Sequence, residues 1–156
     1  MKKFSVVEDK NVKFLEEKGI KYCYVILTEN ILNKSILDAT TPIRAFLKSE
    51  GIHDYNCQQN GQEFKVLIKT HILTFSRSID SETSLYRAGA RGDERMWFGS
   101  SIIGITQPND VYAIFSCSKE LYLINISRIE LEEVWKSSVP TPIGEFIAQK
   151  LTNSSY

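Results

Sequence analysis

The chain has 156 residues, of which 42% are hydrophobic and 24% are charged, and its formal net charge at pH 7 is zero. This length and composition fit one globular domain whose core is large enough to fold without disulfides or a metal. The balanced charge counts against an indiscriminate nucleic-acid binder, which carries a clear basic excess, but it is compatible with a domain that keeps its positive charge in one cleft.

The cysteines and the apolar runs indicate a cytoplasmic protein. Cys23, Cys57 and Cys117 are odd in number and lack the C-x-x-C spacing, so a disulfide framework is not expected. Cys23 and Cys117 lie in apolar runs, where we expect buried thiols. No apolar stretch approaches the roughly 20 residues that span a bilayer, and residues 1–5 have lysines with no apolar segment behind them, so neither a membrane anchor nor a signal peptide is expected.

The first third of the chain predicts a helix, a strand and a second helix. Residues 11–19 are typical of a short helix that ends at a glycine, and residues 22–27 form a β-rich apolar run that predicts a strand. Thr41 and Pro42 predict the next helix, with Thr41 as its N-cap, proline at its first position and Gly51 just after its end. Its apolar face consists of Ile43, Phe46 and Leu47.

The middle of the chain changes to the two-residue period of strands. Residues 64–69 alternate in this way, and short apolar runs predict further strands at residues 84–86, 95–98, 111–115 and 121–126. A turn is predicted at residues 108–110 and a hairpin link at residues 118–120.

Near the end, Thr141 and Pro142 repeat the cap-and-proline start of a helix. Its apolar stripe consists of Ile143, Phe146, Ile147 and Leu151. The order of a strand, a helix, many short strands and a helix favours a mainly β, α+β domain or a barrel. No internal repeat or linker is visible, so residues 1–156 are expected to form a single domain.

Residues 54–65 are too polar to be a plain connection between strands. Five carboxamide side chains lie within seven residues. Asparagine and glutamine carry a donor and an acceptor side by side, which matches the major-groove edge of adenine. The alternative is a solvated hairpin loop, because asparagine and glycine favour turns in any case.

Residues 86–98 form a second polar segment, with three arginines at a spacing of four. Arg87, Arg91 and Arg95 flank two glycines and the acids Asp93 and Glu94. Arginine binds phosphate or pairs with two acceptors on guanine. A carboxylate accepts a hydrogen bond from the amino group of cytosine or holds an arginine in position. The alternative is a set of loop salt bridges, each worth little if it is exposed. The apolar residues 96–98 are expected in the core.

Residues 84–87, 91–97 and 108–115 resemble the effector-binding N-terminal domains of EcoRII-type restriction enzymes. They also resemble the DNA-binding domains fused to LlaJI-type and McrB-like restriction GTPases, which share the DNA-binding pseudobarrel fold with plant "B-three" transcription factor domains. The resemblance covers roughly residues 54–127. It implies an open pseudobarrel of about seven strands with short helices at its ends.

In that family two loops, the N-arm and the C-arm, grip the major groove, and the resemblance implies that residues 56–65 and 87–95 are these arms. The N-arm opens with Asn56, and its candidates for base contacts are Gln58, Gln59, Asn60 and Gln62. Those of the C-arm are Arg91, Asp93, Glu94 and Arg95. The candidates for phosphate contacts are Lys65, Lys69, Arg77 and Arg87.

The predicted function is site-specific binding of double-stranded DNA in a restriction system, with no cofactor and no catalysis by this domain. The resemblance implies that the native protein continues past Tyr156 into an AAA+ GTPase, which recruits a nuclease subunit. Residues 1–156 contain no Walker A motif that could serve as this motor.

The main alternative is a Mg²⁺-dependent nuclease of the PD-(D/E)xK class. Asp54 followed by Glu63 and Lys65 fits its spacing of a carboxylate and then a strand that carries acid-x-lysine. Residues 62–64 resemble the corresponding stretch of PvuII-type restriction enzymes. The same residues also fit a solvated strand edge with alternating charges.

A second alternative is a protein–protein adaptor domain, which the zero net charge favours slightly. An adaptor domain of this kind would have an exposed apolar patch at its surface instead of two polar arms. The two histidines, His53 and His71, have no metal-ligating partners at suitable spacing and are expected at the surface.

Overall fold

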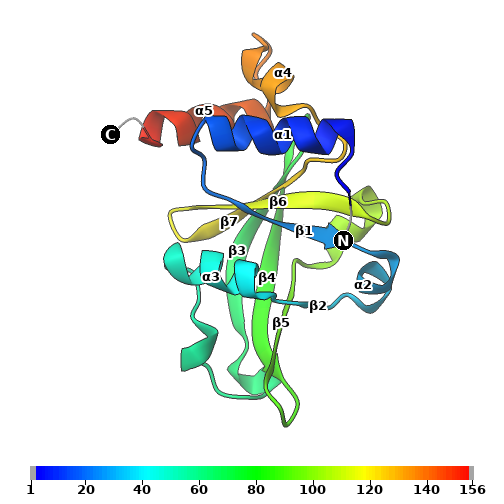
Figure 1. Ribbon diagram of the computed structural model, residues 1–156. Helices are drawn as coiled ribbons and strands as arrows, with labels where there is room; N and C mark the ends of the chain where they lie inside the picture. Colours follow the sequence, from blue (N-terminus) through cyan, green and yellow to red (C-terminus); the bar gives the residue numbers. More distant parts are fainter. Residues whose placement is uncertain (1–2, 155–156) are drawn as a thin grey trace.

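Seven strands form one curled, mixed sheet in the computed structural model, which describes residues 3–154 (Figure 1). The strand order is β1-β6-β7-β3-β4-β5-β2, and every neighbouring pair is antiparallel except β3 and β7. The strands are β1 (Cys23–Leu27), β2 (Leu37–Asp38), β3 (Val66–Leu73), β4 (Ser78–Ala88), β5 (Asp93–Trp97), β6 (Asp110–Cys117) and β7 (Glu120–Asn125). Because β1 and β2 are edges that do not pair with each other, the half-barrel stays open between them.

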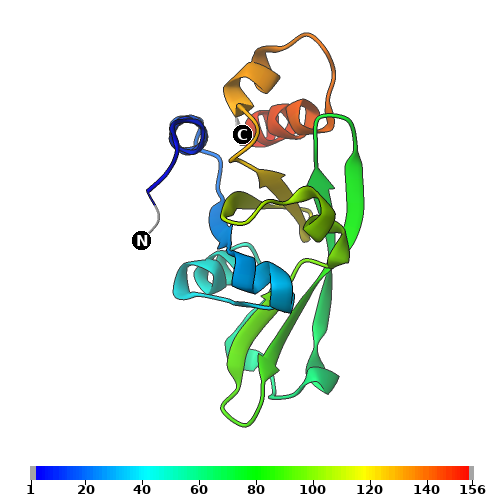
Figure 2. The same ribbon diagram turned by 90° about the vertical axis from the view of Figure 1, so that its right-hand side faces the viewer.

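Short helices lie at both ends of the curled sheet. Helices α1, α4 and α5 gather at one end, whereas α2 and α3 lie on either side of the short strand β2 (Figures 1 and 2). The α-helices are α1 (Val6–Glu17), α2 (Glu29–Lys34), α3 (Thr41–Ser49), α4 (Leu131–Lys136) and α5 (Pro142–Ser154), and the 3-10 helices are η1 (Tyr55–Cys57), η2 (Gln62–Phe64) and η3 (Ser100–Ile105). The predicted fold class, a mainly β, α+β open barrel of about seven strands, is confirmed.

The sheet separates two hydrophobic clusters. One packs α3 against the inner sides of β1, β4, β5 and β6, with Met96 and Phe98 completely buried. The other packs α1, α4 and α5 against β6 and β7. Strand β6 contributes to both clusters, so its residues are buried on both faces and its sequence is a continuous apolar run instead of an alternating one. The prediction that residues 96–98 belong to the core is confirmed.

Several boundaries differ from the predicted ones because capping and pairing decide where an element begins. Helix α1 begins at Val6 and not near residue 11, since Ser5 and Glu8 form a capping box there. The N-cap of α3 is Thr40 and not Thr41. Strand β4 has eleven residues where three were predicted, because its polar first half pairs residue by residue with β3. The prediction of a buried thiol holds for Cys23, whereas Cys117 is partly exposed.

The predicted turns have the backbone geometry that their residues favour. Gly51 follows α3 with φ of +69°, and the β6–β7 hairpin turns through Ser118 and Lys119, with φ of +53° and +67°. Successive left-handed residues are typical of the tight turns that match the twist of a hairpin. Within residues 3–154, no helix is long and apolar enough to cross a membrane.

Candidate nucleic-acid interface

The two polar segments lie side by side at the end of the sheet away from α1, α4 and α5 (Figures 1 and 2). We call residues 56–65 the N-arm and residues 87–95 the C-arm. Asn60 and Arg87 form an isolated parallel bridge, in which the Gly61 N–H donates to the Arg87 carbonyl at 2.9 Å. The Asn60 amide also donates to the Ala90 carbonyl at 3.3 Å. The structure therefore brings the two predicted arms into direct contact.

The N-arm follows a turn that Asp54 fixes. The Asp54 carboxylate accepts the backbone N–H of Asn56 at 3.0 Å, and this hydrogen bond, which favours the ionised form, lowers the pKa of Asp54. The next residue, Tyr55, is buried, and its hydroxyl donates to the Arg95 carbonyl at 2.8 Å. Burial raises the pKa of Tyr55, so the hydroxyl stays a donor. The base of the N-arm is thus attached to the strand β5 that carries the C-arm.

The C-arm is the tip of the β4–β5 hairpin, and two glycines shape it. Gly89 and Gly92 have φ of +63° and +72°, a region that favours glycine. A Cβ atom on Gly92 would also lie 2.4 Å from the side-chain oxygen of Asn60, whereas one on Gly89 would meet nothing within 4 Å. Gly92 is therefore needed for the close approach of the N-arm as well as for the turn.

Gln58 and Arg87 are hydrogen-bonded to the backbone within and beside the arms. The Gln58 amide donates to the carbonyls of Phe64 and Leu85 at 3.0 and 2.9 Å, and its oxygen accepts from His53 at 3.0 Å. The Arg87 side chain is only 17% exposed. It donates to the backbone carbonyls of Tyr55 at 2.8 Å and Gly92 at 2.7 Å. These two predicted DNA contacts therefore have structural roles.

Six predicted arm residues are exposed at this end of the molecule, among them Asn60, whose amide donates to Ala90. Arg91 is the most exposed, with 84% of its side chain accessible and one ion pair to Asp93 at 3.2 Å. The others are Asn56, Gln59, Gln62 and Lys65. Within residues 3–154 the side chains of these four make no hydrogen bond or ion pair, so their donors and acceptors are open to a ligand.

The remaining C-arm residues form an ion-pair network along β5. Arg95 contacts Asp38 at 2.8 Å and Asp93 at 3.4 Å, and its Nε is buried without a partner. Glu94 lies 3.4 Å from Arg87 and 3.8 Å from Arg44. Because the acids neutralise most of these guanidinium groups, the positive charge of the C-arm is smaller than its sequence indicates.

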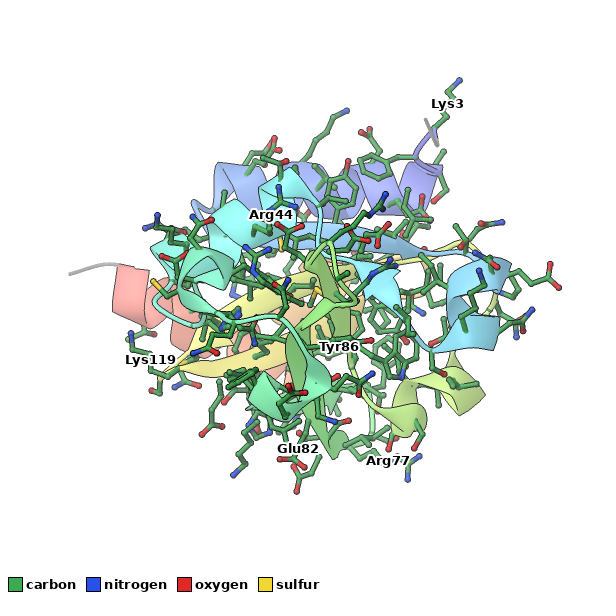
Figure 3. The ribbon with its side chains drawn as sticks, turned by 90° about the horizontal axis from the view of Figure 1, so that it is seen from below. Lys3, Arg44, Arg77, Glu82, Tyr86 and Lys119 are labelled. Carbon is green, nitrogen blue, oxygen red and sulfur yellow. The ribbon has the colours of Figure 1, made fainter. Side chains whose placement is uncertain are left out.

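Two predicted phosphate contacts lie away from the arms. Strand β3 runs from the arms toward the turn that contains Arg77, and this turn closes the far end of the β3–β4 hairpin. The eight residues of β3 extend over about 26 Å, at about 3.3 Å per residue. Lys69 lies halfway along β3, opposite Glu82. Figure 3 views the molecule from the arm end, with Tyr86 near the middle and Arg77 at the margin.

The residues of the nuclease alternative do not have the expected arrangement. Asp54 is occupied as the cap of η1, and Lys48 lies 3.7 Å from its carboxylate. The expectation that Glu63 lies on a strand is wrong, because Gln62–Phe64 is a 3-10 helix and β3 begins at Val66. Within residues 3–154, no group of three or more histidine, cysteine, aspartate or glutamate side chains is placed to hold a metal.

The histidines are less exposed than predicted. His53 packs edge-on against Tyr55 with ring centroids 4.5 Å apart, and burial lowers its pKa. The His71 side chain is 15% exposed, stacks on Tyr122 and contacts Glu120 and Asp80. His53 supports the N-arm through Gln58, a role that nothing in the sequence indicates beyond its position five residues before that glutamine.

No family model, curated protein or solved structure matches this chain. The contacts of the two arms are therefore the basis on which we assign a function.

Proposed function

We propose that this chain binds double-stranded DNA site-specifically through the N-arm and the C-arm, as the target-recognition domain of a restriction system. The observation that carries the proposal is the contact between the arms, made by the bridge of Asn60 and Arg87. Two polar segments that are separate in the sequence thereby form one continuous surface, at the end opposite three of the helices (Figure 1).

The accessible side chains on this surface are suited to reading base edges. The amides of Gln59 and Gln62 each offer a donor beside an acceptor, as adenine requires. Arg91 extends into solvent and is able to pair with guanine or with phosphate, and Lys65 is exposed and able to bind phosphate. Recognition by both arms together gives more specificity than either arm alone.

The supporting residues hold the arms in place before DNA arrives. Gln58 makes three side-chain hydrogen bonds, and Arg87 donates from two different nitrogens to the carbonyl of Tyr55, just before the N-arm, and to that of Gly92 in the C-arm. Ordering loops on binding costs free energy, so arms that are already fixed bind more tightly.

The charge distribution favours sequence readout over general attraction to the phosphate backbone. The net charge is zero, and the acids of β5 pair with Arg87, Arg91 and Arg95. We expect a modest salt dependence that corresponds to a few phosphate contacts. The affinity for random duplex is then weak. The affinity for the specific duplex is higher because the arms contact its base edges.

Selection of binding sites from a pool of random duplexes tests the proposal. We expect enrichment of one short sequence, followed by tight binding of that sequence in an anisotropy titration. The adaptor alternative predicts that no sequence is enriched. A parallel incubation of the selected duplex with Mg²⁺ tests the nuclease alternative, in which cleavage occurs and is lost in Glu63→Ala.

The fused AAA+ GTPase and the nuclease subunit remain predictions from the family resemblance. The proposal assigns cleavage and motor activity to these partners and gives this domain the recognition step alone.

A further inference from the structure

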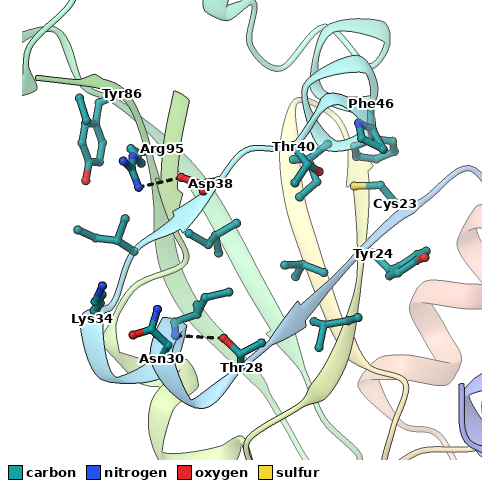
Figure 4. Close-up of a pocket in the computed structure, with 18 of the residues that line it drawn as sticks. Cys23, Tyr24, Thr28, Asn30, Lys34, Asp38, Thr40, Phe46, Tyr86 and Arg95 are labelled. Carbon is teal, nitrogen blue, oxygen red and sulfur yellow. Dashed lines mark hydrogen bonds and ion pairs between the residues drawn. The ribbon is translucent and has the colours of Figure 1, made fainter. Parts of the chain in front are cut away.

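The opening of the half-barrel contains a groove of about 1290 Å³ between the two edge strands (Figure 4). Every residue from Tyr22 to Ile26 lines it on the β1 side, and every residue from Ile36 to Asp38 lines it on the β2 side. Side chains of a strand alternate between its two faces, so a groove that lay against one face would be lined by every second residue. Because consecutive residues line this groove, it is bordered by the edges of the strands and their backbone groups.

The backbone of β1 directs hydrogen-bonding groups into this groove. The residue that follows β7 donates its N–H to the Val111 carbonyl at 2.9 Å, so Val111 faces β7 and its neighbour Tyr112 faces β1. Tyr112 is paired with Val25. The backbone N–H and C=O groups of Tyr24 and Ile26, on either side of Val25, therefore point away from the sheet.

The same alternation applies to β2. The Ala39 N–H donates to the Glu94 carbonyl at 3.0 Å, so Ala39 and Leu37 face β5. The backbone groups of Ile36 and Asp38 then point outward, toward β1. Among residues 3–154, these outward backbone groups on both sides of the groove have no hydrogen-bond partner, a feature that edge strands otherwise cover or avoid.

The side chains of the groove define what fits between the edges. Its apolar floor includes Leu37, Ile43 and Phe46, all of which are buried in the cluster beneath. At the rim the charge of Asp38 is balanced by Arg95, whereas Lys34 is exposed near α2 and Glu16 is exposed near the start of β1. The two ends of the groove therefore carry opposite charges.

We propose that an extended peptide segment of a partner protein binds in this groove as an additional strand between β1 and β2. Its backbone pairs with the outward groups of Tyr24 and Ile26 on one side and of Ile36 and Asp38 on the other. Its alternate side chains are apolar and cover the floor, and it carries an acidic residue beside Lys34. Main-chain pairing supplies affinity, and the alternate side chains and the charge supply specificity.

A second copy of the chain fits the groove less well than a foreign segment. Each β1 already pairs with β6 along one edge and has only one edge free. A twofold pairing of two β1 strands uses that edge and leaves the outward groups of Ile36 and Asp38 on β2 unpaired. An inserted segment pairs with both borders of the groove. Single-stranded nucleic acid is also disfavoured, because the apolar floor and Glu16 offer little to phosphates.

A display library of random nine-residue peptides, selected on the folded protein, tests the proposal. We expect enrichment of peptides with alternating apolar residues and an acid at one end. An enriched peptide is then synthesised with N-methyl groups at alternate backbone nitrogens, which removes the N–H donors needed for pairing but keeps the side chains. We expect this peptide to bind with at least tenfold lower affinity. We expect Lys34→Glu to lower the affinity for the enriched peptide. A second peptide, with lysine in place of the acid, should bind this variant with the affinity restored.

Ile26→Pro removes one outward N–H without touching the pairs between β1 and β6, and circular dichroism shows whether this variant folds. If Ile26→Pro does not fold, the N-methylated peptide tests the same backbone pairing with the unchanged protein. Four results would overturn the proposal. They are no enrichment, binding that is insensitive to N-methylation, displacement of the peptide by a single-stranded oligothymidine, and concentration-dependent dimers that the peptide disrupts, which would assign the groove to a second copy. None of these results depends on duplex binding by the arms, which the same samples report in an anisotropy titration.

Discussion

Individual side chains of the arms fall into two groups that their residue types do not distinguish. Gln58 and Gln59 are adjacent in the sequence, yet one is fully hydrogen-bonded within the protein and the other is exposed. Arg87 and Arg91 differ in the same way, with 17% and 84% of the side chain exposed. Both arms therefore contain residues that are hydrogen-bonded within the protein as well as residues that are exposed to a ligand.

Arg87→Ala is expected to lower the free energy of unfolding by about 2 kcal/mol, because it leaves the carbonyls of Tyr55 and Gly92 without a charged donor. Arg87→Lys restores only part of the loss, since lysine lacks the planar fork. The matched control is Arg91→Ala, which we expect to change the free energy of unfolding by less than about 0.5 kcal/mol. Urea denaturation measures all three, and equal effects of Arg87→Ala and Arg91→Ala would contradict the assignment.

Gln59→Ala and Arg91→Ala are each expected to weaken binding of the selected duplex by about 1–3 kcal/mol and to leave random duplex nearly unaffected. The physical reason is the loss of base-edge hydrogen bonds by exposed side chains that have no structural role. Arg77→Ala, which removes an exposed cation at the far end of the β3–β4 hairpin, is the control and should leave specific binding unchanged. A larger effect of Arg77→Ala than of Arg91→Ala, measured by anisotropy, would place the DNA elsewhere.

Protonation of His53 is expected to loosen the N-arm. Burial lowers the pKa of His53 below the usual value of 6.5, so the unfolded chain binds a proton that the folded chain does not. The contribution of His53 to stability is therefore complete above about pH 6.5 and decreases as the pH falls through the lower, folded-state pKa. Urea denaturation at pH 7.5 and 5.5 should show a smaller loss of stability on acidification in His53→Gln than in the unchanged protein. An identical loss in both would contradict this role.

At the scale of elements, sequence reasoning succeeds where a pattern is long enough to identify a period. The apolar runs that became β6 and β7 and the cap-and-proline start of α5 are found in the structure close to their predicted positions. Strand β2 has two residues and α2 has six, so neither shows a period. Both form because their neighbours, β5 and the apolar cluster beneath, provide hydrogen bonds and packing partners.

The two glycines of the C-arm provide a matched pair of element-scale variants. Both have positive φ, so alanine at either position costs about 1–2 kcal/mol in left-handed strain. Only at Gly92 does the new methyl group collide with Asn60 and displace it from Ala90. We expect Gly92→Ala to weaken specific DNA binding severalfold more than Gly89→Ala, as measured by anisotropy. Equal binding by the two variants would show that contact between the arms does not matter.

For the whole molecule, the decisive feature is which distant segments meet. The register of the β3–β4 hairpin places Val66 beside Leu85, so the residues before β3 and those after β4 emerge at the same end of the sheet. The polar character of both arms can be predicted from the sequence, and their proximity follows from this pairing. The roles of Gln58 and Arg87 could not be predicted, because their partners lie as many as 32 residues away in the chain.

The open edge between β1 and β2 is the second feature of the whole molecule. The ion pair of Arg95 with Asp38 joins the C-arm to one border of the groove. A polar surface at the arms and an apolar groove between the edge strands are thus held by one sheet, and they adjoin at Gln62 and Gly89, which also line the groove.

Backbone amide NMR shifts, followed while the selected duplex is titrated into the protein, test the central claim most directly. We predict that the amides of residues 56–65 and 87–95 shift together, with one common affinity, while those of α1, α4 and α5 stay unchanged. Shifts confined to the helical end, or to one arm alone, would contradict binding of DNA by the joined arms.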